Sequence, residues 1–197
     1  MKALQDHRTL SQYRAIDLSL FALILIVFET VIVRASNHWF PKEPWTVSAV
    51  AAVIAIVMVR WGPWAVIHAV LGGIVYVMTS GGEPRQYLIY CLGNTAALAV
   101  LPLLRKLGWE RLHRDFLINL LYSLLTVLAT QAGRAVLAMI LGTAPAAAAG
   151  FITTDVVTYI FTGTIVWIAS RLDGVLEDQK HYLMRINDPK NREGGIA

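Results

Sequence analysis

The chain has 197 residues, of which 56% are hydrophobic and 15% are charged, and its mean hydropathy is +0.56. A soluble domain carries roughly a quarter charged residues, so this composition excludes an ordinary soluble domain and predicts an integral membrane protein. The net charge of +4 and the isoelectric point near 9.4 do not indicate nucleic-acid binding, because an excess of lysine and arginine in loops on one side of a membrane gives the same balance.

Six apolar segments predict an all-α, six-helix transmembrane bundle, since a backbone in lipid must satisfy its own hydrogen bonds. Their bounds are 15–34, 46–60, 63–79, 86–104, 116–141 and 146–171. The first shows no small-residue cleavage site, so we expect it to stay as a span rather than to be removed as a signal peptide. The second would measure only about 22 Å at 1.5 Å per residue, so we expect it to be tilted, extended or partly buried.

Glycine and proline mark the turns between these segments. Pro41 and Pro44 precede the second, WGPW (61–64) leads into the third, TSGGEPR (79–85) into the fourth and GTAP (142–145) into the sixth. Such residues interrupt helices. They divide the chain into a cytoplasmic segment (1–14), the six-helix domain (15–171) and a cytoplasmic part (172–197) with an amphipathic helix and a disordered tail.

The distribution of lysine and arginine predicts the orientation. Most of the 17 fall in the two termini and the two even-numbered loops, which places both termini in the cytoplasm of a cell membrane protein. With this topology, Glu29, Tyr90, Arg134 and Asp155 all lie toward the outer side, on different helices. Ionisable groups within a membrane cost about 3 kcal/mol each and usually face the protein interior or a water-filled cavity.

We therefore predict a substrate pocket that opens outward and is roofed by the first outer loop, 35–45. Aromatic rings of the pocket would stack on a flat ligand, and its amide, guanidinium and carboxylate groups would orient that ligand. The candidate substrate-binding residues are Glu29, Asn37, His38, Trp39, Trp45, Tyr76, Tyr90, Asn94, Gln131, Arg134, Asp155, Thr158 and Tyr159.

Each of these residues also has a purely structural interpretation. Glu29, Arg134 and Asp155 would brace the bundle if they paired with one another, and Asn94 and Tyr159 would serve as hydrogen bonds between helices. The tryptophans would form an interfacial aromatic belt, and His38 would be an ordinary loop histidine.

We expect no metal, no cofactor and no catalytic residues. An enzyme would need a nucleophile or an acid–base pair at hydrogen-bonding distance. Asp155 and Tyr159, four residues apart, are the candidate pair for that role.

Small residues form a stripe on the first segment, at Ala15, Ser19 and Ala22. Such a stripe lets another helix approach closely, either within the bundle or in a partner. With Ala15-Ile-Asp-Leu-Ser19, the Gly-Pro-aromatic turn at 62–64 and the outward polar pocket, the chain resembles the S component of energy-coupling factor transporters. These are the substrate-binding membrane subunits of vitamin importers of the ABC class.

That resemblance covers roughly residues 14–186 and implies a function and partners. The chain would capture a vitamin or a precursor, and a transmembrane coupling subunit and two cytosolic ATPases would supply the energy. The loops 35–45 and 80–85 would gate the pocket, and the stripe would meet the partner. The alternative is a membrane scaffold protein similar to MreD, the cell-shape protein, which has a similar size and number of spans.

Overall fold

The computed structural model describes residues 9–41 and 47–187, and every regular element in these ranges is helical. The long α-helices are α1 (Leu10–Trp39), α2 (Val50–Trp61), α3 (Val66–Ser80), α4 (Pro84–Asn94), α7 (Phe116–Ile140) and α10 (Val156–Ser170). The shorter ones are α5 (Leu101–Leu107), α6 (Trp109–Arg114), α8 (Pro145–Ala148), α9 (Gly150–Thr153) and α11 (Gln179–Asn187). Two 3₁₀ segments, η1 (Gly62–Ala65) and η2 (Thr95–Val100), join α2 to α3 and α4 to α5. The predicted all-helical class is confirmed.

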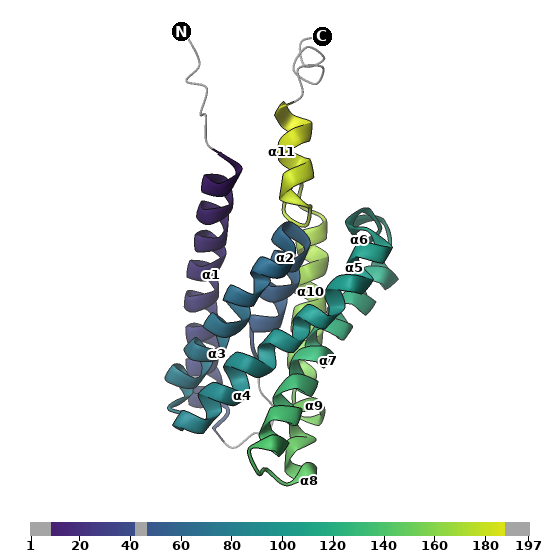
Figure 1. Cartoon of the computed structure of the whole chain (residues 1–197). Coiled ribbons are helices and arrows are strands. Elements are labelled where there is room, and N and C mark those ends of the chain that lie inside the picture. The colour runs from purple at the N-terminus through teal and green to yellow at the C-terminus, as the bar shows by residue number, and fades with distance from the viewer. Residues whose placement is uncertain (1–8, 42–46, 188–197) are drawn as a thin grey trace.

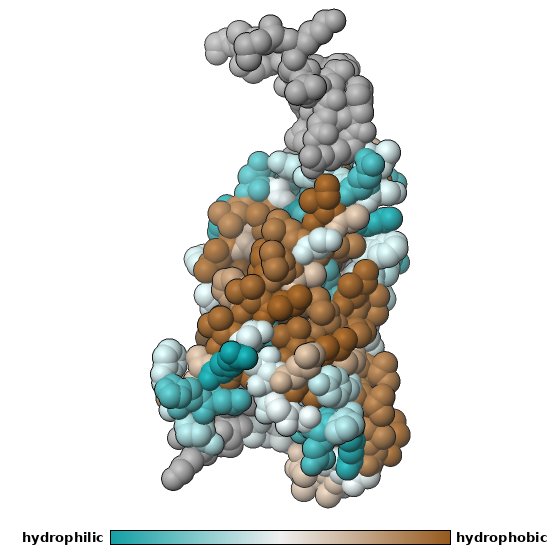
Figure 2. Space-filling view, turned by 90° about the vertical axis from the view of Figure 1, so that its left-hand side faces the viewer, coloured by the Kyte–Doolittle hydropathy of each residue, from teal (hydrophilic) through white to brown (hydrophobic). Residues whose placement is uncertain are grey.

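Five helical stretches of the described chain are long and apolar enough to cross a membrane. They are Leu10–Trp39, Val50–Ser80, Pro84–Leu107, Phe116–Ile140 and Pro145–Ser170. The side of the molecule on which α1 lies is largely hydrophobic across its middle, with hydrophilic residues toward both ends (Figure 2). By length and composition, this is the pattern of a multi-pass membrane protein.

The stretch Val50–Ser80 is not one straight helix, because the chain reverses at Gly62. This glycine has φ of +59° and ψ of −121°, a conformation that side chains other than glycine rarely adopt. A Cβ placed on Gly72, in α3, would lie 2.6 Å from the side chain of Val50 at the start of α2. The start of α2 therefore touches a residue well along α3 from the turn, and the two helices form an antiparallel hairpin (Figure 1).

The short helix α2 is the centre of the bundle. All 12 of its residues are buried, because α1, α3, η2, α7 and α10 all pack against it. Its sequence, VAAVIAIVMVRW, is hydrophobic on every side apart from Arg60, which is the pattern of a helix with no face toward solvent. The start of α1 and the start of α11 lie at the same end of this bundle (Figure 1).

Two carboxylates of α1 hold the two ends of α2. At one end, Asp17 accepts hydrogen bonds from Arg60 Nε (2.8 Å), Arg60 Nη2 (2.7 Å) and Trp61 Nε1 (2.5 Å). At the other end, Glu29 accepts from the Ser48 hydroxyl (2.8 Å) and the Ala49 backbone N–H (2.7 Å). A carboxylate beside the first residues of a helix satisfies N–H groups that the helix itself leaves without partners.

The helix bounds differ from the predicted ones, and two of the differences bear on the predicted site. Elsewhere, the helix α1 begins at Leu10 rather than at residue 15, and the predicted span 86–104 is divided into α4, η2 and α5. The helix α1 continues through Trp39, so the outer loop does not begin at residue 35 as we predicted. The chain leaves the helical conformation at Phe40, the residue before Pro41, where a following proline disfavours helical backbone. The predicted last span, 146–171, is interrupted near Ala149 and again at Thr154 and Asp155, which divides it into α8, α9 and α10.

Candidate functional site

Arg134 is the centre of a buried polar network at the end of the bundle opposite the start of α1. Its side chain is on α7, and the residue is only 5% exposed. Its Nε donates to Asn94 Oδ1 (2.7 Å), and its Nη1 donates to Gln131 Oε1 (3.2 Å). Asn94 is held in turn by its own donation to the Ala69 carbonyl (2.9 Å). The guanidinium is therefore fixed by α3, α4 and α7 together.

The network continues from Gln131 to the last span. The Gln131 amide donates to Asp155 Oδ2, and Thr158 Oγ1 donates to Asp155 Oδ1 (2.7 Å). Thr158 also accepts from the Ser48 backbone N–H (3.1 Å), and the Ser48 hydroxyl donates to Glu29. Glu29, Arg134 and Asp155 thus belong to one chain of hydrogen bonds, with Gln131 bonded to both Arg134 and Asp155.

Glycines let the backbones of α4 and α7 approach closely enough to form this network. A Cβ on Gly93 would lie 2.8 Å from the backbone N and Cα of Arg134. A Cβ on Gly133 would lie 2.3 Å from the Gly93 carbonyl oxygen. Neither position has room for a side chain, so the two helices cross in direct backbone contact beside the Asn94–Arg134 hydrogen bond.

A cavity of about 260 Å³ adjoins the network. It is lined by Tyr90, Gln131, Arg134, Ala147, Gly150, Phe151, Thr154 and Asp155. Asp155 lies at the interruption between α9 and α10, so its carboxylate is placed at the cavity wall by a break in the helix. The cavity is smaller than the roughly 300–1,000 Å³ of pockets for drug-sized molecules, which suits a ligand about the size of one or two rings.

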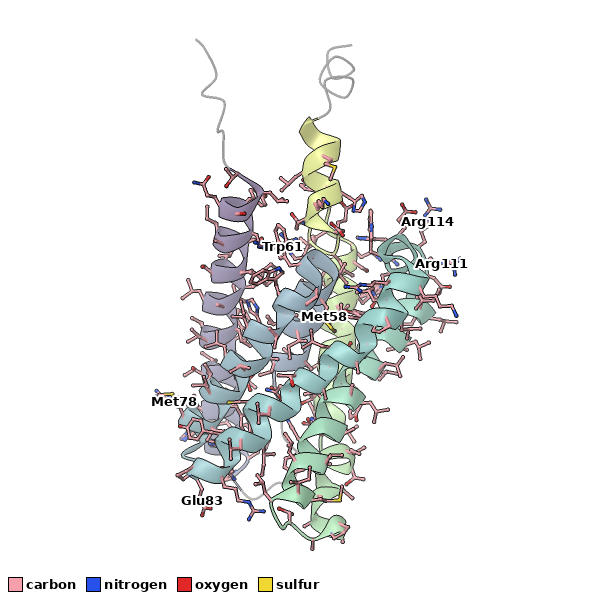
Figure 3. All side chains as sticks on the ribbon, viewed as in Figure 1. Met58, Trp61, Met78, Glu83, Arg111 and Arg114 are labelled. Carbon is pink, nitrogen blue, oxygen red and sulfur yellow. The ribbon has the colours of Figure 1, made fainter. Side chains whose placement is uncertain are left out.

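Aromatic rings form one side of this cavity. The guanidinium of Arg134 lies over the Tyr90 ring, with Cζ 4.7 Å from the ring centroid. Tyr76 stacks behind Tyr90, with ring centroids 4.4 Å apart, and Phe151 meets Tyr90 edge-on at 5.9 Å. Met78 and Glu83, at the ends of α3 and α4, mark this end of the bundle in Figure 3. Among the hydrogen bonds of the described residues, Arg134 Nη2 makes none, so this N–H group is free to meet a ligand.

The structure brings together part of the predicted set. Tyr90, Gln131, Arg134 and Asp155 line the cavity, and Tyr76 supports Tyr90 from behind. The other predicted residues of the network, Glu29, Asn94 and Thr158, are buried next to those four. Tyr159 is half-buried, and its hydroxyl, which is shielded from solvent, has no hydrogen-bond partner among the described residues.

The predicted loop residues do not reach the cavity. Asn37, His38 and Trp39 form the last turn of α1, and all three are exposed, Trp39 by 70%. They face outward because the helix continues farther than we predicted and carries them along its own axis. Trp45, the remaining loop residue, lies outside the described residues.

Four cavity residues were not predicted: Ala147, Gly150, Phe151 and Thr154. Helical spacing from Asp155 is a signal for two of them, because Phe151 and Ala147 precede it by four and eight residues. The alanine run 146–149 indicates a helix but carries no polar group that would point to a site. Small side chains there leave space for the cavity, and Phe151 closes it.

The small-residue stripe of α1 remains accessible on the surface of the described chain. Ala15 and Ser19 are exposed, and Ala22 is half-buried. Asp17, which lies between the first two in sequence, points instead into the bundle toward Arg60. Packing within the bundle therefore does not use Ala15 and Ser19.

The substitution Glu29→Gln is expected to reduce stability while leaving the cavity intact. The amide retains one acceptor oxygen but directs an NH₂ group at the second donor, so a buried hydrogen bond is lost at a cost of about 1–3 kcal/mol. The melting temperature of the purified protein measures this change, and the exposed Glu110→Gln is the matched control. If Glu29→Gln kept its melting temperature and lost a bound ligand, Glu29 would belong to the ligand site.

A comparison of the chain with protein-family models, with curated proteins and with solved structures found no match.

Proposed function

We propose that the chain is a membrane-embedded substrate-binding subunit, of the kind found as the S component of energy-coupling factor importers. The observation that carries this proposal is the position of Arg134 beside a cavity lined by Asp155 and aromatic rings. This guanidinium is buried, and its Nη2 donates to no acceptor among the described residues. A scaffold has no use for charged groups held at such a cavity. Buried charges in membrane proteins generally mark substrate or ion pathways.

The proposal includes six passes with both termini in the cytoplasm. It is supported by the reversal of the chain at Gly62, which makes Val50–Ser80 a hairpin of two short passes. The excess of lysine and arginine near the start of α1, around α5 and α6, and near α11 supports the same orientation. In this arrangement the cavity opens toward the outer side.

The lining defines a class of ligand. Arg134 Nη2 would donate to a carbonyl or carboxylate oxygen, and Asp155 would accept from an N–H group or balance a cationic nitrogen. Tyr90 and Phe151 would contact the faces and edges of a flat ring. The break in the helix at Asp155 supports this, because interrupted spans form the binding sites of many transporters. The ligand class is a small heterocyclic nutrient such as a vitamin or its precursor.

The test is identification of the molecule that remains bound after gentle extraction, by mass spectrometry, followed by a thermal-shift screen against water-soluble vitamins. We expect one compound to raise the melting temperature by several degrees. Arg134→Lys, which keeps the charge but loses the planar fork, should weaken its binding at least tenfold. Phe151→Leu should weaken it less, and the exposed Arg34→Lys on α1 should not change it. If neither the bound molecule nor any tested compound depended on Arg134, the proposal would be wrong.

Partners distinguish the transport role from the alternative scaffold role. We expect a transmembrane coupling subunit and two ATPases to co-purify with the chain through the exposed stripe at Ala15 and Ser19. Ser19→Leu should abolish this co-purification without changing ligand binding, because Ser19 lies far along α1 from the cavity. Recovery of cell-wall synthesis proteins in place of ATPases would favour the MreD-like scaffold.

A further inference from the structure

A second cavity lies at the other end of the bundle and belongs to no part of the proposed substrate site. Its volume is about 410 Å³, and its walls come from α1, the α2–η1 turn, α5, α6 and the start of α11. Trp61 lies at this end in Figure 3, away from Met78 and Glu83. Four cations line it, Arg14, Arg60, Arg105 and Lys180, together with Trp61, Trp64 and Trp109.

The positive charge of this cavity is not balanced by its own lining. Arg60 also lines it, but Asp17 already neutralises that guanidinium, and Arg60 Nη1 donates to the carbonyls of Gly174 (2.6 Å) and Val175 (2.7 Å). Asp178, a carboxylate in the lining, accepts from the backbone N–H groups of Lys180 (2.9 Å) and His181 (3.3 Å) at the start of α11. Asp178 therefore caps the start of α11. Arg14, Arg105 and Lys180 together carry more charge than this one carboxylate.

The three cations are placed where an anion is able to reach them. Arg14 is half-buried, and its guanidinium lies 4.3 Å from the centroid of the Trp64 ring, so the side chain is held in position rather than spread into solvent. Arg105 and Lys180 are exposed at the rim. Cations from α1, α5 and α11 therefore surround one space instead of forming a stripe along one helix.

The rest of the lining is apolar. Leu10, Met58, Leu101 and Leu104 contribute apolar walls, and Met58, Leu101 and Leu104 precede the ends of α2 and α5 that carry Arg60 and Arg105. Tryptophan rings beside cations are typical of the boundary between lipid and water. A cavity with hydrocarbon walls and a cationic rim matches a molecule with an acyl chain and an anionic head. Basic pockets between helices on the cytoplasmic side of a membrane bind phosphate-bearing headgroups in this way.

We propose that this cavity binds the headgroup of an anionic phospholipid, with the phosphate held by Arg14, Arg105 and Lys180. The inference does not depend on which ligand the cavity at Arg134 takes. A free phosphate ion shares the chemistry of the headgroup but makes no use of the apolar walls, so the two ligands are distinguishable by experiment.

The test is native mass spectrometry of the full chain in detergent, titrated with phosphatidylglycerol, phosphatidylcholine or inorganic phosphate. We expect phosphatidylglycerol to bind at least tenfold more tightly than phosphatidylcholine. The double substitution Arg14→Gln/Arg105→Gln should reduce phosphatidylglycerol binding at least tenfold. The matched control is Arg111→Gln/Arg114→Gln, which removes the same charge at the same end of the molecule from side chains that point away from the bundle (Figure 3).

Several results would overturn the proposal. Equal binding of the two lipids would exclude a charge-selective site, and an equal loss in the control variant would show a general effect of net charge. Displacement of the lipid by millimolar inorganic phosphate alone would assign the site to the free ion. The melting temperature of each variant without added lipid checks folding, and Lys180→Gln, on an exposed side chain of α11, gives an independent single substitution with an expected threefold or larger loss.

Discussion

Replacement of Arg60 by methionine is expected to lower the free energy of unfolding by about 3–5 kcal/mol, because it leaves the buried carboxylate of Asp17 without its counter-charge. Both residues are less than a tenth exposed, and the pair is bidentate, with N–O distances of 2.7 and 2.8 Å. Among the described residues, only Trp61 Nε1 would remain as a side-chain donor to Asp17. The carbonyls of Gly174 and Val175 would also lose the hydrogen bonds from Arg60 Nη1, and Gly174 would keep the one from Gln179 Nε2 (2.9 Å). This loss loosens the segment before α11.

The measurement is unfolding of the purified protein in mixed micelles, with Arg111→Met as the control for removal of an exposed arginine. The double variant Asp17→Leu/Arg60→Met should recover more than half of the loss, because replacing both charges by apolar groups removes the unpaired ion. It should not recover all of it, since the carbonyls of Gly174 and Val175 still lack the hydrogen bonds that Arg60 donates. A loss below about 1 kcal/mol in the single variant, as for an exposed ion pair, would show that the pair does not anchor α2.

Substitution of Gly133 by alanine is expected to cost about 3 kcal/mol, the upper part of the range for overpacked sites. The new Cβ would lie 2.3 Å from the Gly93 carbonyl oxygen and 2.5 Å from Ala96 Cβ. Because the obstacle is backbone, no side-chain rotation relieves it, and α4 and α7 must separate. That movement would stretch the hydrogen bond between Arg134 and Asn94, so ligand binding at the cavity should fall with stability.

Gly150→Ala is the matched control for this prediction. Gly150 lines the same cavity and has an ordinary helical backbone, and a Cβ there would meet nothing within 4 Å. We expect it to leave the melting temperature unchanged or slightly raised, as alanine stabilises a helix relative to glycine. If Gly133→Ala and Gly150→Ala behaved alike in melting temperature, the close crossing of α4 and α7 would not limit stability.

The helices and the polar network illustrate what local sequence patterns predict. Long apolar runs indicated the helices because hydrophobicity is a property of consecutive residues. The convergence of Gln131, Arg134 and Asp155 followed from placing each at a depth along its helix. The bounds were less well predicted: nothing in Ser36, Asn37 and His38 forbids a helix, so α1 ends only where Pro41 requires it.

The ion pair of Asp17 and Arg60 was not predicted, because its partners are 43 positions apart and each had another interpretation. Arg60 falls at the end of the second predicted span, where it counts toward the loop charges, and Asp17 falls within the motif Ala15-Ile-Asp-Leu-Ser19. Helical geometry already separates Asp17 from that stripe, since it lies about 200° around the helix from Ala15. The position of Phe151 in the cavity wall was not predicted for another reason. It depends on the orientation of α9 relative to Tyr90 of α4, and no local sequence pattern specifies that orientation.

The two carboxylates of α1 impose a length requirement on the helix they hold. Asp17 and Glu29 are twelve positions apart, and α2 itself has 12 residues, about 18 Å at 1.5 Å per residue. One residue inserted between Asp17 and Glu29, or within α2, would shift an attachment point by about 1.5 Å and rotate it by about 100°, so both contacts would not form at once. Insertions and deletions are therefore excluded from these two segments, and any rearrangement of the protein must carry α2 together with this part of α1 as one unit.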